Sequence, residues 1–344
     1  MNSKYYIHKE GLQLESGERL KELTIAYHTY GNYDPKRNNV IWVCHALTAN
    51  SDVFDWWKGL FGENDLFNPR DYFIVCDNFL GSCYGTTGPL SENPENGQAY
   101  YHDFPQLTVR DLVAAHEILR KHLQIERIQM MIGSSLGGMQ ALEWAYLLNG
   151  ELDNLVVLAS NAKHSPWGIA FNESQRMAVE VDPSWKESNE KAGLDGMRVA
   201  RSIALLSYRT YATYDHSQQE NEEDKTDDFR ASSYQRYQGE KLARRFNAYS
   251  YWHLSKIMDS HDLGRGRNGL VAALGQIKSR SLIIGVNTDQ IFPIDEQRFV
   301  AKHIPHASFL EIKSLYGHDG FLLEQEQLSK VLESFLIESK NNEQ

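Results

Sequence analysis

Residues 128–138 combine a short apolar run with a turn rich in glycine and serine. They read Ile128-Gln129-Met130-Met131-Ile132-Gly133-Ser134-Ser135-Leu136-Gly137-Gly138, and the helix-forming residues 139–148 follow. This order predicts a buried strand, a sharp turn and a helix. The turn fits the pattern G-x-S-x-G, which in such a context presents the oxygen of its central serine above the edge of a sheet. It is typical of a reactive serine, and the alternative is a tight turn with an inert one.

Strand-like and helical segments alternate on both sides of this turn. Apolar runs predict strands at residues 20–27, 40–44, 72–76, 128–132, 155–159, 281–286 and 308–312. Helical patterns predict helices at residues 112–123, 139–148, 296–303 and 328–336. Continuous apolar runs are typical of strands buried on both faces of a parallel sheet. The sequence therefore predicts an α/β fold with a mostly parallel central sheet and helices on both faces.

The alternation stops near Lys163 and resumes only at Ser281. The residues between look helical and polar, and they include a helical pattern at residues 194–211. An acidic run follows at residues 220–228, where we expect an exposed loop. Beyond it the sign of the charge reverses, and a single acid, Glu240, stands among Arg230, Arg236, Lys241, Arg244 and Arg245. We predict a sheet-based core at residues 1–164 and 280–344, with a helical insertion at residues 165–279.

The composition and charge of the 344 residues exclude several classes of protein. Hydrophobic residues make up 41% and charged residues 24%, so we expect neither a disordered nor a fibrous chain. The net charge of −11 would repel a phosphate backbone, which argues against nucleic acid as a partner. No segment has the ~20 apolar residues that span a membrane, and no signal peptide is recognisable. Three cysteines, two of them in apolar runs, favour reduced thiols in a cytoplasmic protein.

Neither a metal site nor a dinucleotide site is predicted. The chain has neither H-E-x-x-H nor paired C-x-x-C, so we expect catalysis without a metal. Residues 264–269 match G-x-G-x-x-G, but no strand precedes them and no βαβ unit surrounds them. Two arginines of this segment, Arg265 and Arg267, remain candidates for contact with an anion. We expect no permanently bound cofactor.

A reactive serine needs a base and an acid that orients the base. On a sheet of this kind the three groups follow one another in the order Ser, Asp, His. Asp289 leaves the end of the strand expected at residues 281–286, and His318 follows the last strand and precedes a helix. We therefore predict a catalytic triad of Ser135, Asp289 and His318. The alternative for His318 alone is an ordinary histidine at the start of a helix.

The same chemistry needs two backbone N–H groups that hold a developing oxyanion. One comes from the residue after the nucleophile, Leu136, and the other comes from the loop after an early central strand. That loop reads Cys44-His45-Ala46-Leu47-Thr48, so Leu47 is the expected second donor. The alternative is a plain loop between a strand and a helix.

Six blocks of sequence, taken in their order along the chain, point to a known family. They are residues 44–48 (CHALT), 78–89 (NFLGSCYGTTGP), 137–144 (GGMQALEW), 237–248, 261–266 (HDLGRG) and 317–319 (GHD). Together they resemble, over nearly the whole chain, the homoserine O-acetyltransferases of the α/β-hydrolase superfamily. The resemblance implies the α/β-hydrolase fold with a helical lid insertion. It also implies acyl transfer from acetyl-coenzyme A, as co-substrate, to the hydroxyl of L-homoserine in methionine biosynthesis, by a homodimer whose lids pair.

The resemblance also implies how the acceptor amino acid is bound. Arg201 and Tyr208 match the family positions that grip its carboxylate, and two residues seven apart on a helix share one face. Asp319 matches the acid that meets the ammonium group, and Thr48 matches a residue that lines the same site. Without the resemblance, Arg201 would be interpreted as a solvated helix residue. The basic residues at 230–245 could contact the phosphates of coenzyme A, or could form a solvated helix face.

The expected mechanism is a two-step, ping-pong transfer through an acyl-Ser135 intermediate. His318, oriented by Asp289, would take the serine proton in the first step and the proton of the acceptor hydroxyl in the second. A helical lid would exclude water, which competes with the acceptor. Three alternatives remain: a homoserine or serine O-succinyltransferase of the same fold, a serine esterase, and a non-catalytic binding protein that kept the fold.

Overall fold

A mixed sheet of eight strands forms the centre of the computed structural model, which describes residues 3–148 and 150–342. The strands lie in the order β1-β4-β6-β5-β9-β10-β11-β12. In that order they span Lys4–His8, Leu23–Tyr30, Phe73–Asp77, Val40–Cys44, Ile128–Ser134, Leu152–Leu158, Arg280–Val286 and Ala307–Ile312. The pairs β1–β4 and β4–β6 are antiparallel, and the other neighbouring pairs are parallel. This confirms the predicted mostly parallel sheet.

Two short hairpins lie outside the main sheet. One pairs β2 (Leu12–Gln13) with β3 (Arg19–Leu20), and the other pairs β7 (Glu92–Asn93) with β8 (Gln98–Ala99). The strand expected at residues 20–27 is therefore two strands, because the chain turns between β3 and β4.

Successive residues of the central strands face two separate hydrophobic clusters, one on each side of the sheet. In β5, Trp42 belongs to one cluster, whereas Ile41 and Val43 belong to the other. In β9, Met131 and Ile132 divide in the same way. All five side chains are fully buried. Both faces need apolar side chains, and the strands are therefore continuous apolar runs rather than alternating ones.

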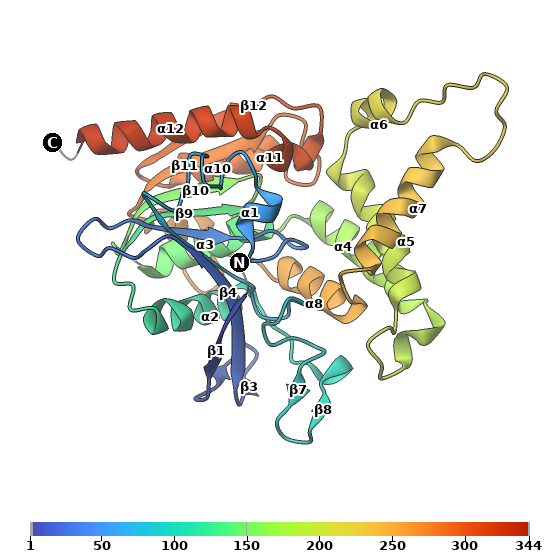
Figure 1. The fold of residues 1–344 in the computed structure, drawn as a ribbon, viewed down its shortest axis with the longest axis horizontal. Helices are drawn as coiled ribbons and strands as arrows, with labels where there is room; N and C mark the ends of the chain where they lie inside the picture. The colour runs from blue at the N-terminus through green and yellow to red at the C-terminus, as the bar shows by residue number, and fades with distance from the viewer. Residues whose placement is uncertain (1–2, 149, 343–344) are drawn as a thin grey trace.

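Helices cover both faces of the sheet (Figure 1). The cluster that contains Trp42 receives apolar side chains from α2 (Val109–His122), α3 (Leu136–Leu148) and α10 (Ile294–His303). The opposite cluster receives them from α1 (Val53–Trp56), α11 (Gly320–Leu323) and α12 (Gln325–Asn342). The predicted layering of helices on both faces is thus confirmed.

Between β10 and β11 the chain forms helices α4 to α9. They span Pro166–Glu180, Leu194–Tyr208, Tyr211–Ser217, Arg230–Ala243, Ala248–Asp259 and Leu270–Leu274. Helix α5 packs on α4 and on α7, and α4 also packs on α8. Figure 1 shows α5, α6 and α7 projecting to one side of the sheet. The bounds of residues 165 and 279 for a helical lid remain a prediction.

The helix predicted at residues 194–211 is divided into α5 and α6. Thr210 caps the start of α6, because its hydroxyl accepts the N–H of Thr213 at 3.0 Å. Gly317 packs against the end of α5, where a side chain at this glycine would lie 2.8 Å from the carbonyl oxygen of Tyr208. This contact joins residues that are far apart in the sequence, so the helical periodicity does not reveal it. The acidic run at residues 220–228 is an exposed loop between α6 and α7, as expected.

Both arginines of the segment at residues 264–269 form ion pairs within the protein. Arg265 pairs with Glu15 at 2.7 Å, and Arg267 pairs with Glu143. Both arginines therefore have carboxylate partners within the protein. The three cysteines are free thiols. Among residues 3–148 and 150–342, no helix is long and apolar enough to cross a membrane. The same residues contain no cluster of three His, Cys, Asp or Glu side chains suited to a metal ion.

Candidate active site

The turn between β9 and α3 holds the backbone of Ser135 at a φ of 55°, in the left-handed region. Residues other than glycine rarely adopt this conformation, and the surrounding structure must impose it. Two glycines provide the space. A Cβ at Gly133 would lie 2.2 Å from the carbonyl oxygen of Gly137, and a Cβ at Gly137 would lie 1.9 Å from that of Cys44. Helix α3 therefore begins directly against the end of β5.

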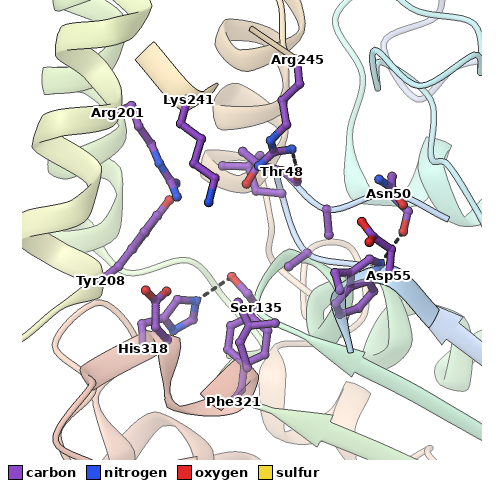
Figure 2. Close-up of a pocket in the computed structure, with 16 residues that line it drawn as sticks. Thr48, Asn50, Asp55, Ser135, Arg201, Tyr208, Lys241, Arg245, His318 and Phe321 are labelled. Carbon is purple, nitrogen blue, oxygen red and sulfur yellow. Dashed lines mark hydrogen bonds between the residues drawn. The ribbon is translucent and has the colours of Figure 1, made fainter. Parts of the chain in front are cut away.

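Ser135, His318 and Asp289 form a continuous chain of hydrogen bonds. Nε2 of His318 lies 2.9 Å from Oγ of Ser135 (Figure 2), and Nδ1 lies 2.7 Å from Oδ2 of Asp289. The three residues follow β9, β12 and β11, which are parallel strands that end at the same edge of the sheet. The structure thus brings together the three side chains of the predicted triad. Their catalytic role remains a prediction.

The surroundings of the triad fix its orientation. Oδ1 of Asp289 accepts the backbone N–H groups of Ile291 and Phe292, both at 2.9 Å. The ring of His318 lies near the rings of Phe292 and Phe321, with centroid separations of 5.1 Å and 5.2 Å. Ser135, Asp289 and His318 are all buried. With one carboxylate oxygen held by the backbone, the other can accept the Nδ1–H of His318, which leaves Nε2 as a base toward Ser135.

The loop after β5 reaches the same place. Leu47 lines a cavity together with Ser135, and Leu136 is the first residue of α3. His45 is the first residue of this loop, and burial lowers its pKa to about 4, so its imidazole is neutral at pH 7. Nδ1 of that ring lies 2.9 Å from the carbonyl oxygen of Ala46, which braces the loop. Leu47 and Leu136 therefore lie beside Ser135, and their role as oxyanion donors remains a prediction.

A cavity of about 450 Å³ opens above Ser135 and is lined by all four residues that the resemblance assigns to the acceptor. Arg201 and Tyr208 come from α5, Thr48 comes from the loop after β5, and Asp319 follows His318. The guanidinium carbon of Arg201 lies 5.6 Å from the centroid of the Tyr208 ring (Figure 2). Burial raises the pKa of Tyr208, so its hydroxyl stays protonated and can donate a hydrogen bond.

Asp319 already has a partner inside the protein. Nε of Arg209 donates to its Oδ2 at 2.7 Å, and both side chains are mostly shielded from solvent. Arg209 directly follows α5, and nothing in its sequence context predicts this ion pair. A carboxylate can accept several hydrogen bonds, so Asp319 can still accept one from an ammonium group.

Two basic residues that the sequence leaves in an unassigned cluster also line the cavity. They are Lys241, near the end of α7, and Arg245, just after it. Nη1 of Arg245 donates to the carbonyl oxygen of Thr48 at 2.6 Å. All three basic side chains are exposed to solvent, but Arg244 does not line the cavity and pairs with Glu240 at 3.4 Å. The reversal of charge after the acidic loop was the only signal in the sequence, and it cannot distinguish the residues that face the cavity from those that do not.

The chain resembles known proteins along nearly its whole length. The model of the family described as "alpha/beta hydrolase fold" matches residues 39–325. A homoserine O-acetyltransferase of Cyclobacterium marinum is 52% identical over 339 residues, which cover 98% of this chain and 96% of the relative. A solved structure of homoserine O-acetyltransferase from Staphylococcus aureus is 28% identical with a TM-score of 0.81, covering 97% of this chain and 95% of that one. Esterase E22 has a TM-score of 0.89 at 19% identity, covering 97% and 99%, a likeness that shows the fold alone.

Proposed function

We propose, because this chain belongs to the homoserine O-acetyltransferase family of α/β hydrolases, that it transfers the acetyl group of acetyl-coenzyme A to the hydroxyl of L-homoserine. The observation that carries the proposal is the hydrogen-bonded chain of Ser135, His318 and Asp289 beneath a cavity that Arg201 also lines. A nucleophile, a base and a carboxylate-binding cation thereby face one small space. An amino acid with a hydroxyl side chain is a class of acceptor that suits such a space.

In the first half-reaction, Oγ of Ser135 attacks the thioester carbonyl of acetyl-coenzyme A. His318 takes the serine proton at Nε2 as the bond to the acyl carbon forms. The N–H groups of Leu136 and Leu47 stabilise the oxyanion of the tetrahedral intermediate. When the intermediate collapses, the carbon–sulfur bond breaks, the thiolate of coenzyme A receives the proton from His318, and acetyl-Ser135 remains.

In the second half-reaction, L-homoserine enters the cavity. Arg201 and Tyr208 hold its carboxylate, and Asp319 holds its ammonium group. His318 removes the proton of the acceptor hydroxyl, whose oxygen attacks the acetyl carbon. The ester bond to Ser135 breaks, the serine oxygen regains a proton from His318, and O-acetyl-L-homoserine leaves. Acetyl-coenzyme A serves as a co-substrate, so this cycle uses no permanently bound cofactor.

Transfer exceeds hydrolysis only where the acceptor outcompetes water at acetyl-Ser135. The triad is buried, and α5 and α7 contribute the cavity residues Arg201 and Lys241. These helices thus act as a lid that limits the water around the ester. An acceptor held by both of its charged groups would reach the acetyl carbon at a high effective concentration.

We further propose that the enzyme acts in the cytoplasm, in methionine biosynthesis, as a homodimer that pairs through its lid. Membership of the family supports the pathway. The exposed apolar side chains of Val199 and Leu206 on α5, and of Tyr237 on α7, support the pairing. Exposed apolar side chains that gather on one surface are typical of protein interfaces.

A succinyl donor is a second candidate, because the cavity contains more cations than an acetyl donor needs. A succinyl group adds a distal carboxylate, and Lys241 and Arg245 both line the cavity in which it would lie. A serine acceptor, or water as in an esterase, would use the same acyl-Ser135 intermediate.

One experiment separates these activities. The enzyme is mixed with acetyl- or succinyl-coenzyme A, with and without L-homoserine or L-serine, while free thiol and intact protein mass are followed. With acetyl-coenzyme A alone, we expect one equivalent of thiol and an acetyl adduct on the protein. Adding L-homoserine should start turnover. Equal thiol release without any acceptor would contradict a transferase, and the absence of an acylated protein with either donor would contradict the covalent mechanism.

A further inference from the structure

We propose that Lys241 is a second binding residue for the carboxylate of the acceptor, acting together with Arg201. The inference rests on the proposed function, which it extends by naming a residue that selects anionic acceptors. The inference is drawn from the packing of α7 on α5, from the lack of ion pairs for two cations among residues 3–148 and 150–342, and from the position of charge in the substrates.

The packing of α7 on α5 places both cations at one cavity. At Gly239 the two backbones approach so closely that a Cβ would lie 2.7 Å from the carbonyl oxygen of Arg198. Gln235 of α7 donates from Nε2 to the carbonyl oxygen of Ser202 on α5 at 3.0 Å. The two contacts, at Arg198 and at Ser202, flank Arg201 along α5 and fix the position of α7 relative to it. Figure 2 shows the side chains of Arg201 and Lys241 pointing from the two helices into the space above Ser135.

Neither cation is neutralised within the part of the chain that the structure describes. There, Arg201 makes no ion pair and lies over the ring of Tyr208, and Lys241 makes neither an ion pair nor a hydrogen bond. Neighbouring basic residues are paired: Arg209 with Asp319, and Arg198 with Glu240. Two unpaired like charges that face one cavity repel each other, and a bound anion would relieve that repulsion. Two carboxylates, Asp55 and Asp319, also line the cavity, but Asp319 is paired with Arg209 and Asp55 lies beside Asn50, across the cavity from the two cations (Figure 2). The side of the cavity formed by α5 and α7 is therefore the side that suits an anion.

The chemistry of the two substrates identifies the anion. The acetyl group is neutral, and the phosphates of coenzyme A are separated from the thioester by the whole pantetheine arm. The carboxylate of L-homoserine is separated from its hydroxyl only by two methylene groups and the α-carbon. When that hydroxyl reaches His318, the carboxylate must lie in the same cavity. Arg201 can bind it through two N–H groups, and the ammonium of Lys241 can bind a remaining lone pair.

Arg245 is not the second partner of the carboxylate. Its guanidinium group is already bonded to the carbonyl oxygen of Thr48 and to the hydroxyl of Tyr84. It holds the loop after β5 against the lid. Lys241, with a flexible side chain and three donors, is the cation that is free to close on the acceptor.

The test compares L-homoserine with 3-aminopropan-1-ol, which has the same hydroxyl and amine but no carboxylate. In the Lys241→Met variant, we expect kcat/KM for L-homoserine to fall about 10-fold, as for the loss of one charged hydrogen bond at the solvent-exposed rim of the cavity. The kcat/KM for 3-aminopropan-1-ol, and the rate of acetylation of Ser135 by acetyl-coenzyme A alone, should not change. Lys241→Arg should keep most of the activity with L-homoserine.

Lys186→Met is the matched control, because Lys186 is an exposed lysine between α4 and α5 that does not line the cavity. It should behave like the wild type with both acceptors. Calorimetric titration of L-homoserine into Ser135→Ala and into Ser135→Ala/Lys241→Met gives a second measurement that does not depend on turnover. The double variant should bind about 10-fold more weakly.

Three results would overturn the inference. An equal loss with both acceptors would mean that Lys241 only supports the structure. A slower acetylation of Ser135 would mean that Lys241 serves the donor. A loss confined to succinyl-coenzyme A would mean that it binds a dicarboxylic acyl group. A wild-type enzyme that acetylates no L-homoserine would instead contradict the proposed function, and the binding titration would still test Lys241.

Discussion

Ser135 is held in its strained conformation by backbone hydrogen bonds rather than by its side chain. Its N–H donates to the carbonyl oxygen of Leu158 at 3.1 Å, and its own carbonyl oxygen accepts the hydroxyl of Ser160 at 2.7 Å and the N–H of Gly138 at 2.9 Å. A left-handed φ at such a residue costs about 1 kcal/mol. The turn therefore persists when the hydroxyl is removed, which makes side-chain variants at this position informative about chemistry.

The Ser135→Ala variant should bind acetyl-coenzyme A but release no thiol and gain no acetyl mass. Without Oγ no acyl-enzyme can form, so kcat should fall at least about 10⁴-fold. Stopped-flow thiol detection and intact mass measure both signals. The melting temperature should stay near that of the wild type, and an acetyl adduct on this variant would place the nucleophile elsewhere.

The Asp289→Asn variant should keep the fold and lose activity. An amide oxygen can still accept the N–H groups of Ile291 and Phe292, which preserves the loop. The amide nitrogen, however, cannot accept Nδ1–H of His318, so the imidazole loses the tautomer that leaves Nε2 basic. We expect kcat to fall about 10³- to 10⁴-fold, measured under saturating substrates. A loss of less than tenfold would contradict an orienting role for Asp289.

At the scale of elements, the close contact between the start of α3 and the end of β5 fixes the position of Ser135 relative to the sheet. The Gly137→Ala variant would place a methyl group 1.9 Å from the carbonyl oxygen of Cys44, so α3 must move away from the sheet. We expect a loss of about 3 kcal/mol in the free energy of unfolding and a large fall in kcat. Denaturant unfolding and acylation rates measure the two effects.

Gly275→Ala is the control for that change. Gly275 has an ordinary helical φ of −64°, and a side chain there would come no closer than 3.2 Å to the nearest atom. It should cost well under 1 kcal/mol. Equal effects of the two substitutions would contradict a specific requirement for glycine at residue 137.

The local pattern of sequence located most elements of the core but not every boundary in the lid. The apolar runs of β5, β9 and β11 were found because each strand carries its own signal over a few residues. The end of α5 at Tyr208 was missed, since it depends on the approach of Gly317 from the far end of the chain. The partner of Asp319 was missed for the same reason, because Arg209 lies 110 positions away in the sequence.

At the scale of the whole molecule, four buried histidines should lower the free energy of unfolding as the pH falls. Burial lowers the pKa of His45, His164 and His253 to about 4 and that of His261 to about 3. Below the ordinary value of about 6.5, the unfolded chain binds protons that the folded chain does not. The free energy of unfolding should therefore be highest above pH 6.5 and should fall as the pH drops towards 4, by about 1.4 kcal/mol per pH unit for each proton.

His116 contributes with the opposite sign. Burial lowers its pKa, but the carboxylate of Asp77, 2.7 Å away, and other hydrogen bonds raise it more. Its contribution is therefore present at low pH and is lost as the pH rises through its raised pKa. Among these five histidines one group opposes four, so their net effect should remain acid destabilisation. Thermal unfolding between pH 4 and 8 tests the sign, and the His253→Gln variant should reduce the proton uptake by about one.

The proposed homodimer predicts a second property of the whole molecule. Val199 and Leu206 are seven residues apart on α5 and therefore share one exposed face. Sedimentation velocity should show a species of twice the chain mass, and Leu206→Glu should shift it towards the monomer because a charge in an apolar interface is costly to desolvate. A Lys302→Glu variant on α10 is the control. A wild-type chain that sediments as a monomer would contradict pairing through the lid.

The sequence by itself determined the parallel strands of the sheet, the turn that carries Ser135, and the order of Ser135, Asp289 and His318. These features depend on residues within a few positions of one another, or on strands that must end at one edge of a parallel sheet. Only the tertiary structure decided that Lys241 faces the cavity while Arg244 faces solvent, and that Arg245 is bound to the loop of Thr48. Charge along a helix shows which residues are basic, but the packing of α7 on α5 decides which of them can reach a substrate.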